Sequence, residues 1–166
     1  MSNMTVQEIE ISRLDKDNIP SDFAEALFKV ADTGFKNGSP WTIKQIEETI
    51  GTDYTLVTYA TIAHQVVGFI MASVTFDMAD VFMVVVSADF KKRAIGTKLF
   101  DAFIGYCAEA EMNEIILEVR ASNAPAIALY ERVGFQTVGL RKAYYSSPIE
   151  DAIIMKRNIG EEKDDC

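Results

Sequence analysis

The sequence contains few of the residues from which metal centres and disulfide frameworks are built. Among its 166 residues there is one histidine, His64, and there are two cysteines, Cys107 and Cys166. Two cysteines supply neither a disulfide framework nor the spacing of a metal site, so we expect no metal. Cys107 falls on the apolar face of an expected helix, where a buried thiol is the simplest interpretation. His64 falls in an expected turn, and we do not assign it as a base.

Long hydrophobic runs are also missing. No stretch approaches the ~18 apolar residues that a membrane-spanning helix needs, and residues 1–5 lack the basic segment before an apolar stretch that marks a secretory signal. We therefore expect no membrane partner and, from the cysteine usage, a cytoplasmic location. The sequence has no repeat and no Pro/Ser-rich linker. It predicts one domain over residues 1–159 and a polar C-terminal tail over residues 160–166 that we expect to be frayed.

Positive charge is in short supply. The chain has 16 Lys and Arg against 25 Asp and Glu, a formal net charge of −9. A general nucleic-acid-binding surface would be basic, so we expect no direct nucleic-acid partner. The acidity suits a cationic substrate, and it also serves solubility alone. Within this acidic chain four cations fall in eight residues, at Lys91, Lys92, Arg93 and Lys98.

The apolar pattern predicts an α/β (α+β) domain. β-Branched and aromatic residues favour strands, and apolar residues at helical spacing favour helices. We expect strands near 6–14 and over 54–59, 66–76, 80–86, 114–120, 135–145 and 150–155, and helices from about 22, over 42–49, from 95 and from 123. The expected N-caps are Ser21, Thr42 and Asn123, and the expected turns lie at 63–65 and 77–79. A strand–helix–strand crossover flanked by hairpins predicts a mixed sheet with helices on both faces.

An apolar strand, a basic turn and a helix start follow one another over residues 84–99. Small residues at Ala94 and Gly96 let a ligand approach the backbone, and the free N–H groups of a helix start favour phosphate oxygens. Neighbouring cations would add charge-assisted contacts. These residues indicate an anion site, and a solvated basic turn before an amphipathic helix stays open as the alternative. A P-loop is excluded because the glycine and lysine stand in the wrong order, and the Rossmann glycine pattern is missing.

This loop resembles the acyl-CoA loop of the GNAT superfamily of N-acetyltransferases, whose pattern is Gln/Arg-x-x-Gly-x-Gly/Ala. Residues 91–96 match it with two departures, Lys91 for Gln or Arg and Ala94 for the first glycine. Residues 117–135 resemble, much more specifically, the strand–helix segment of the ribosomal protein alanine N-acetyltransferases, the RimI type. The likeness continues at 141–145 and 150–155, and residues 40–42 (Pro-Trp-Thr) are similar to the family's Pro-Trp-Ser. It covers roughly residues 35–155 and implies the GNAT fold, a mixed, largely antiparallel seven-stranded sheet.

The resemblance implies acetyl-CoA as cosubstrate and a set of site residues. The strand before the loop would pair its backbone with the pantetheine arm, and the N–H groups of the loop would hold the pyrophosphate. The expected cofactor-binding residues are Val84, Val85, Val86, Lys91, Lys92, Arg93, Ala94, Ile95, Gly96, Thr97 and Asn123. Glu118 matches the family's proton acceptor, and Tyr130 matches its proton donor.

Each of these residues has a purely structural alternative. Glu118 stands in an apolar strand, where it could instead pair with Arg120, Arg132 or another cation. Tyr130 could be a core aromatic residue whose hydroxyl is bonded locally. The role of Asn123 is already explained by capping of its helix.

The resemblance implies transfer of an acetyl group to the N-terminal alanine of small-subunit ribosomal protein eighteen, by direct attack in a ternary complex. A second possibility is an enzyme of the same fold that acetylates another protein N-terminus, a lysine or a small amine. A third is a non-catalytic acyl-CoA-binding module, which the presence of both Glu118 and Tyr130 disfavours. We expect acceptor specificity to lie in the first two helices and in residues 144–150.

Overall fold

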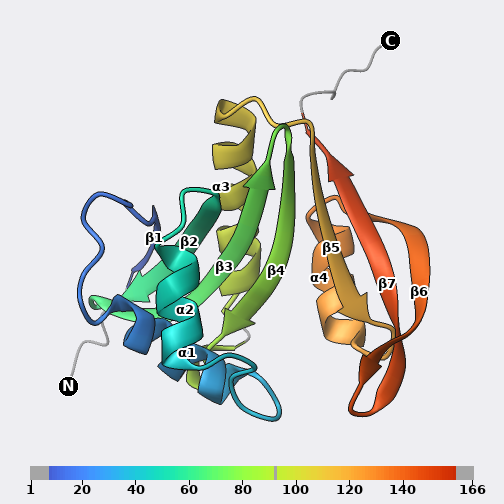
Figure 1. The fold of residues 1–166 in the computed structure, drawn as a ribbon, viewed down its shortest axis with the longest axis horizontal. Coiled ribbons are helices and arrows are strands. Elements are labelled where there is room, and N and C mark those ends of the chain that lie inside the picture. The colour runs from blue at the N-terminus through green and yellow to red at the C-terminus, as the bar shows by residue number, and fades with distance from the viewer. Residues whose placement is uncertain (1–7, 92, 160–166) are drawn as a thin grey trace, which may run out of the picture.

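The computed structural model describes residues 8–91 and 93–159, which form a single seven-stranded sheet with helices on both faces (Figure 1). The strand order is β1-β2-β3-β4-β5-β7-β6. All neighbouring strands are antiparallel except β4 and β5, which run parallel. The predicted mixed sheet is therefore confirmed. The predictions for Lys92 and for the tail at 160–166 lie outside the described residues.

Seven strands and four helices of the described residues follow one another along the chain, with a short 3-10 turn after β4. Their bounds are β1 (Ile9–Arg13), α1 (Phe23–Gly34), α2 (Ile43–Ile50), β2 (Thr55–Ile62), β3 (Gln65–Thr75), β4 (Met78–Val86), a 3-10 turn (Ala88–Phe90), α3 (Ile95–Glu109), β5 (Glu114–Arg120), α4 (Ala124–Arg132), β6 (Gln136–Ser146) and β7 (Ile149–Asn158). Every predicted strand and helix is present.

Two of the three predicted N-caps are confirmed. The Thr42 side chain accepts the N–H of Gln45, and the Gln45 side chain accepts the N–H of Thr42. These reciprocal hydrogen bonds form a capping box at the start of α2. Asn123 accepts the N–H of Ala126 at the start of α4. The prediction for Ser21 was wrong: α1 has Asp22 at its N-cap position, and no side chain caps it.

In the β2–β3–β4 meander the first turn lies where it was predicted, and the second does not. Ala63 and His64 both have positive φ, which makes the tight turn expected at 63–65. The second turn lies at residues 76–77, so the turn predicted at 77–79 began one residue and ended two residues too late. Phe76 has a φ of 55°, and β4 already begins at Met78, so the residues assigned to the turn belong largely to the strand.

The hydrophobic core consists of two clusters, one on each face of the sheet. Buried residues of α1 and α2 pack on β2, β3 and β4 on one face. Buried residues of α3, together with Tyr130, Val133 and Phe135 around α4, pack on the other face. Cys107 lies fully buried in this second cluster, and burial raises the pKa of its thiol to about 12, as expected for a structural cysteine.

A β-bulge changes the direction of the side chains halfway along β4. Met71 of β3 lies opposite Met83 whereas Ala72 lies opposite Val81, so Phe82 is an extra residue in β4. Val81 consequently packs in the α3 cluster and Met83 in the α1 cluster. Without the extra residue the two side chains would point to the same face.

The one parallel pair of strands among the described residues also separates near this bulge. β4 and β5 are paired from Met78–Glu114 to Val81–Leu117, and the pairing ends there. Beyond it the two strands diverge toward their carboxyl ends (Figure 1). The start of α3 follows β4, and the start of α4 follows β5. Both helices therefore begin at the open end of the pair.

Candidate active site

The open end of the β4–β5 pair leaves one edge of β4 without a neighbour. Residues Met83–Val86 are paired with β3 on one side, and no strand of the described residues pairs with them on the side of β5. Unpaired backbone groups at a sheet edge can bind an extended ligand as an added strand. Val84, Val85 and Val86, which the resemblance assigned to the pantetheine arm, lie on this edge.

The start of α3 offers backbone N–H groups that the helix itself does not use. The first helical hydrogen bond runs from the N–H of Lys98 to the carbonyl of Ala94, so Ile95, Gly96 and Thr97 precede it. No side chain of the described residues caps this helix. Three N–H groups at a helix start, where the helix dipole is positive, suit phosphate oxygens.

Ala94 has the backbone conformation of the glycine that it replaces. Its φ of 59° and ψ of 22° place it in the left-handed region, which costs an alanine about 1 kcal/mol. Glycine adopts this conformation without that cost, so the departure from the family's pattern at Ala94 carries a small backbone strain. The fully buried Ile95 side chain holds the next residue in place.

The small residue at position 96 is required by packing between the two helices. A Cβ at Gly96 would lie 2.9 Å from Cδ2 of Leu129 in α4. The start of α3 therefore packs closely against the second half of α4, and the glycine leaves room for the Leu129 side chain.

Two cations of the loop, Lys91 and Arg93, are directed toward protein groups in this structure. Lys91 Nζ donates to the carbonyl oxygen of Gly34, at the end of α1, over 2.9 Å, a favourable position for a cation beside a helix C-terminus. The Arg93 guanidinium lies 5.3 Å from the centre of the Phe90 ring. Their assignment to the pyrophosphate stays a prediction, as does that of Asn123, whose side-chain oxygen caps α4.

Glu118 points away from the α3 cluster, onto the part of the sheet face that α1 and α2 do not cover. Its neighbours Leu117 and Val119 are buried in that cluster, so the alternating residue Glu118 faces the other way. Nε of Arg141, in β6, lies 2.6 Å from Oε2 of Glu118. The N–H of Arg141 is not aligned with this buried oxygen, which accepts no hydrogen bond among the described residues. The cation beside Glu118 is thus Arg141.

Arg120, which the sequence suggested as a partner of Glu118, pairs with Glu150 instead. Arg120 Nη1 lies 3.3 Å from Glu150 Oε1, and the guanidinium stacks over the ring of Tyr145 at 4.3 Å. It also donates to the carbonyl of Pro148. Arg120 therefore anchors the turn between β6 and β7 beside Glu118.

Two residues near Glu118 were missed by sequence reasoning. Burial is the main cause that raises the pKa of Asp80, in β4, and the charge of Glu118 raises it further. Burial and then Glu118 also raise the pKa of Tyr145, in β6. Asp80 could have been noticed as the one carboxylate in an otherwise apolar strand, but its proximity to Glu118 depends on the register between β4 and β5.

Tyr130 lies on the opposite side of the sheet from Glu118. Its ring is 8% exposed and packs edge-on against Phe100, with ring centres 5.6 Å apart. Burial, with a smaller contribution from Tyr145, raises its pKa to about 12. The phenol therefore keeps its proton at neutral pH and is available as a donor.

Glu118 and Tyr130 flank the opening between β4 and β5 from its two faces. No contact joins them in the described residues. Tyr145 lies within electrostatic range of both, since Glu118 raises the pKa of Tyr145 and Tyr145 raises that of Tyr130. A group that reached through the opening would have a carboxylate on one side and a protonated phenol on the other.

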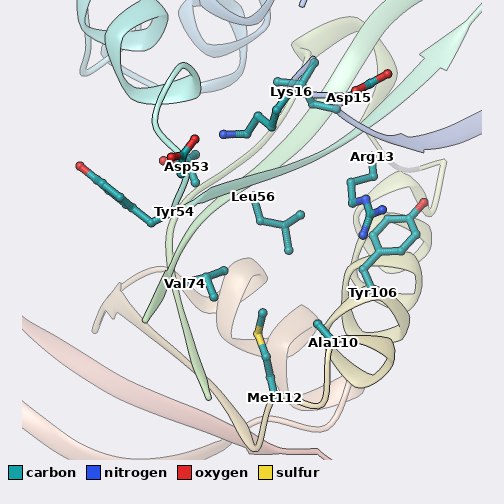
Figure 2. A pocket seen from close by; sticks show the side chains of 12 residues that line it. Arg13, Asp15, Lys16, Asp53, Tyr54, Leu56, Val74, Tyr106, Ala110 and Met112 are labelled. Atoms are coloured by element: carbon teal, nitrogen blue, oxygen red, sulfur yellow. The ribbon is translucent and has the colours of Figure 1, made fainter. Parts of the chain in front are cut away.

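Two cavities lie elsewhere on the molecule. One, of about 420 Å³, lies between the end of β1, the start of β2 and the C-terminal end of α3, with Arg13 beside Tyr106 (Figure 2). The other, of about 780 Å³, runs along α1 and reaches Ser87 and Asp89. Neither is lined by Glu118 or Tyr130.

The described residues contain no cluster of three or more side chains that could hold a metal ion. Within the same residues, no helix has the length and apolar character required to cross a bilayer.

Comparison with known proteins identifies the class of this fold and site. Residues 22–135 match the acetyltransferase (GNAT) family. The chain belongs to this family and is an acetyl-CoA-dependent N-acetyltransferase. The predicted fold and enzyme class are thereby confirmed.

Within the family the chain is similar to enzymes of the RimI type. It is 37% identical over 123 residues to the [ribosomal protein bS18]-alanine N-acetyltransferase of Salmonella typhimurium, covering 73% of this chain and 82% of that protein. An N-alpha-acetyltransferase of Saccharolobus solfataricus is 34% identical over 60% of this chain and 67% of its own length. The crystal structure of the ribosomal-protein-S18-alanine N-acetyltransferase from Escherichia coli superposes with a TM-score of 0.81 and 29% identity, covering 95% of this chain and 100% of that one.

Proposed function

We propose that this enzyme acetylates the N-terminal α-amine of a ribosomal protein, the alanine at the start of bS18, in the cytoplasm. The similarity to two enzymes named for that reaction supports the choice of acceptor. The observation that carries the proposal is the position of Glu118, on the part of the sheet face beyond α1 and α2, where its carboxylate is accessible to an incoming chain end.

The free-energy cost of removing the proton from the acceptor amine favours an α-amine over a lysine. An α-amino group has a pKa of about 7.7–8.0, so neutralising it at pH 7 costs about 1 kcal/mol, whereas a lysine amine costs about 4.6 kcal/mol. A carboxylate, acting directly or through a water molecule, is a sufficient base for the smaller cost. We assign this role to Glu118.

The residues around the β4–β5 opening fit acetyl-CoA. The unpaired edge at Val84–Val86 would bind the pantetheine arm. The N–H groups of Ile95, Gly96 and Thr97 would bind the pyrophosphate. Lys91, Arg93 and Asn123 would contribute after leaving their present partners, and Lys92 is assigned from the sequence alone.

The cosubstrate supplies an activated acetyl group as a thioester. Glu118 would accept the proton of the amine, and the neutral amine would then attack the carbonyl in a ternary complex. A backbone N–H near Val86 would polarise that carbonyl. Tyr130 would donate to the departing sulfur. Because its pKa of about 12 exceeds that of an ordinary thiol, about 8.5, a hydrogen bond is the larger part of this contribution.

The test is a panel of acceptors incubated with acetyl-CoA, with CoA release as the readout. Peptides that begin with alanine should turn over faster than peptides with other first residues, peptides with an internal lysine and small amines. Turnover that is fastest on a lysine or a small amine would replace the proposed acceptor. Binding of CoA without turnover on any acceptor would favour the non-catalytic module.

A further inference from the structure

Asp80 and Glu118 lie on the same face of the sheet, on neighbouring strands. Asp80 pairs in register with Ile116, two residues before Glu118 along the parallel strand β5. The residues flanking Asp80, Ala79 and Val81, are buried in the α3 cluster, so Asp80 faces the same side as Glu118. The pairing ends at Val81 and Leu117, so the two carboxylates are diagonal neighbours on either side of the point where β4 and β5 separate.

A third charged group, the Arg141 guanidinium, lies within electrostatic range of both carboxylates. Although Asp80 as a whole residue is exposed, burial raises the pKa of its carboxyl and the charge of Glu118 raises it further. The Arg141 guanidinium opposes this effect and lowers the pKa of Asp80. Asp80, Glu118 and Arg141 therefore act on one another as two anions and one cation.

The contact of Arg141 with Glu118 is one that an incoming cation can replace. The two charged atoms are 2.6 Å apart, but the buried Oε2 of Glu118 accepts no hydrogen bond among the described residues. The side chain of Arg141 is 58% exposed, and its guanidinium also lies 5.5 Å from the ring centre of Tyr144. It can move into solvent or over that ring at little cost.

We propose that Asp80 and Glu118 together form the subsite for the positively charged α-amine of the acceptor, and that Arg141 holds this subsite when no acceptor is bound. The proposal rests on the proposed function, because it assigns a further residue to acceptor binding at the same site. An ammonium group carries three N–H donors, so it can replace Arg141 at Oε2 of Glu118 and also bond to the carboxylate of Asp80.

The two carboxylates then have different tasks. Glu118 removes the proton that allows attack. Asp80 attracts and orients the charged amine, and its negative charge favours the protonated form of that amine. Loss of Asp80 should therefore weaken acceptor binding without lowering the rate of the chemical step.

The experiment compares two peptides and two proteins. An alanine-initiated peptide with a free N-terminus, and the same peptide acetylated at its N-terminus, are titrated into the wild type and Asp80→Asn by calorimetry, with CoA present in place of acetyl-CoA. The free-amine peptide should bind Asp80→Asn about tenfold more weakly than the wild type. The acetylated peptide, which has no charge at this position, should bind both proteins equally. In steady-state assays the KM for the free-amine peptide should rise by a similar factor, with kcat within twofold of the wild type.

Glu114→Gln is the matched control. Glu114 lies on the same strand and points to the same face as Glu118, and its carboxylate pairs with Lys156. This variant removes one negative charge outside the subsite and should bind both peptides as the wild type does.

Equal weakening of both peptides in Asp80→Asn would mean that Asp80 shapes the groove rather than binding the charge, and it would overturn the proposal. So would unchanged binding of both. Failure of the proposed function has a different signature, because the wild type itself would then not acetylate the alanine-initiated peptide.

Discussion

Glu118 and Tyr130 differ in their environment as much as in their chemistry. Glu118 retains partial access to solvent and contacts a cation that can leave, which suits a group that must meet the acceptor. Tyr130 is surrounded by the rings of Phe100 and Phe135, and its pKa of about 12 keeps it protonated. The motif assigned the two roles, and these environments are compatible with them.

Tyr130→Phe should lower kcat by about 10- to 100-fold, because it removes the hydrogen bond to the departing sulfur, and a hydrogen bond to a charged group contributes about 1.5–3 kcal/mol. Its affinity for acetyl-CoA should be unchanged, because the ring and its packing against Phe100 are kept. Steady-state kinetics with separate titration of acetyl-CoA measure both quantities. A variant that turns over at the wild-type rate would remove Tyr130 from the mechanism.

Glu118→Gln should lower kcat/KM for the acceptor by about 100-fold at pH 7 and by less at pH 9. At the higher pH most of an α-amine is already neutral without a base. Glu114→Gln serves as the control for loss of one charge on β5 and should retain activity. The same deficit at both pH values would count against a base role for Glu118.

At the scale of the element, the β6–β7 hairpin is fastened to the β5–α4 connection by one carboxylate. Glu150 Oε2 accepts the N–H of Ser122 over 2.6 Å, and Glu150 Oε1 lies 3.3 Å from Nη1 of Arg120. Arg120 in turn contacts the ring of Tyr145 and the carbonyl of Pro148. This network holds Tyr145 next to Glu118.

Hydrogen bonding by Ser122, from its side chain first and its backbone second, lowers the pKa of Glu150. A lowered folded-state pKa stabilises the protein above the unfolded value of about 4.3, and this stabilisation is lost as the pH falls through the folded pKa. Glu150→Gln should therefore have a lower Tm than the wild type at pH 7, and the difference should shrink below about pH 4. Thermal melts at both pH values measure this effect. A difference that persists at low pH would mean that the charge of Glu150 is not responsible.

At the scale of the whole molecule, two helix layers pack on opposite faces of the sheet. Within that sheet β4 and β5 are paired at one end and separate at the other. α1 ends against β4, where a Cβ at Gly34 would lie 2.5 Å from the carbonyl oxygen of Val86 and would also overlap the side chain of Val85. This close approach brings the end of α1 to the strand edge that is proposed to bind pantetheine. Lys91 bonds to the carbonyl of the same glycine.

Gly34→Ala should lower the free energy of unfolding by about 2 kcal/mol or more, because the neighbouring backbone carbonyl cannot move aside without shifting β4. Gly105→Ala is the matched control. A Cβ at Gly105, on the surface of α3, meets nothing within 4 Å, so this variant should gain about 0.5–1 kcal/mol. Urea unfolding measures both variants. An unchanged stability of Gly34→Ala would show that α1 is less tightly docked on β4 than these distances indicate.

Local sequence was sufficient for most elements and for the family. The caps Thr42 and Asn123, the turn at 63–65 and the bounds of β5 all depend on residues within a few positions of one another. The stretch from Leu117 to Phe135 carried the assignment of the family, which comparison confirmed. Ser21 was a wrong prediction because two neighbouring residues can both cap a helix, and only the packing of α1 decides where it starts.

The sequence by itself determined the elements, the enzyme class and the identity of the two candidate catalytic residues, because periodicity and motifs are properties of neighbouring residues. The tertiary structure decided the bulge at Phe82, the separation of β4 from β5, the left-handed conformation of Ala94 and the meeting of Asp80, Glu118 and Arg141. Those three charged side chains come from three different strands. Strand register is a relation between distant segments, and it is set by the packing of both faces of the sheet.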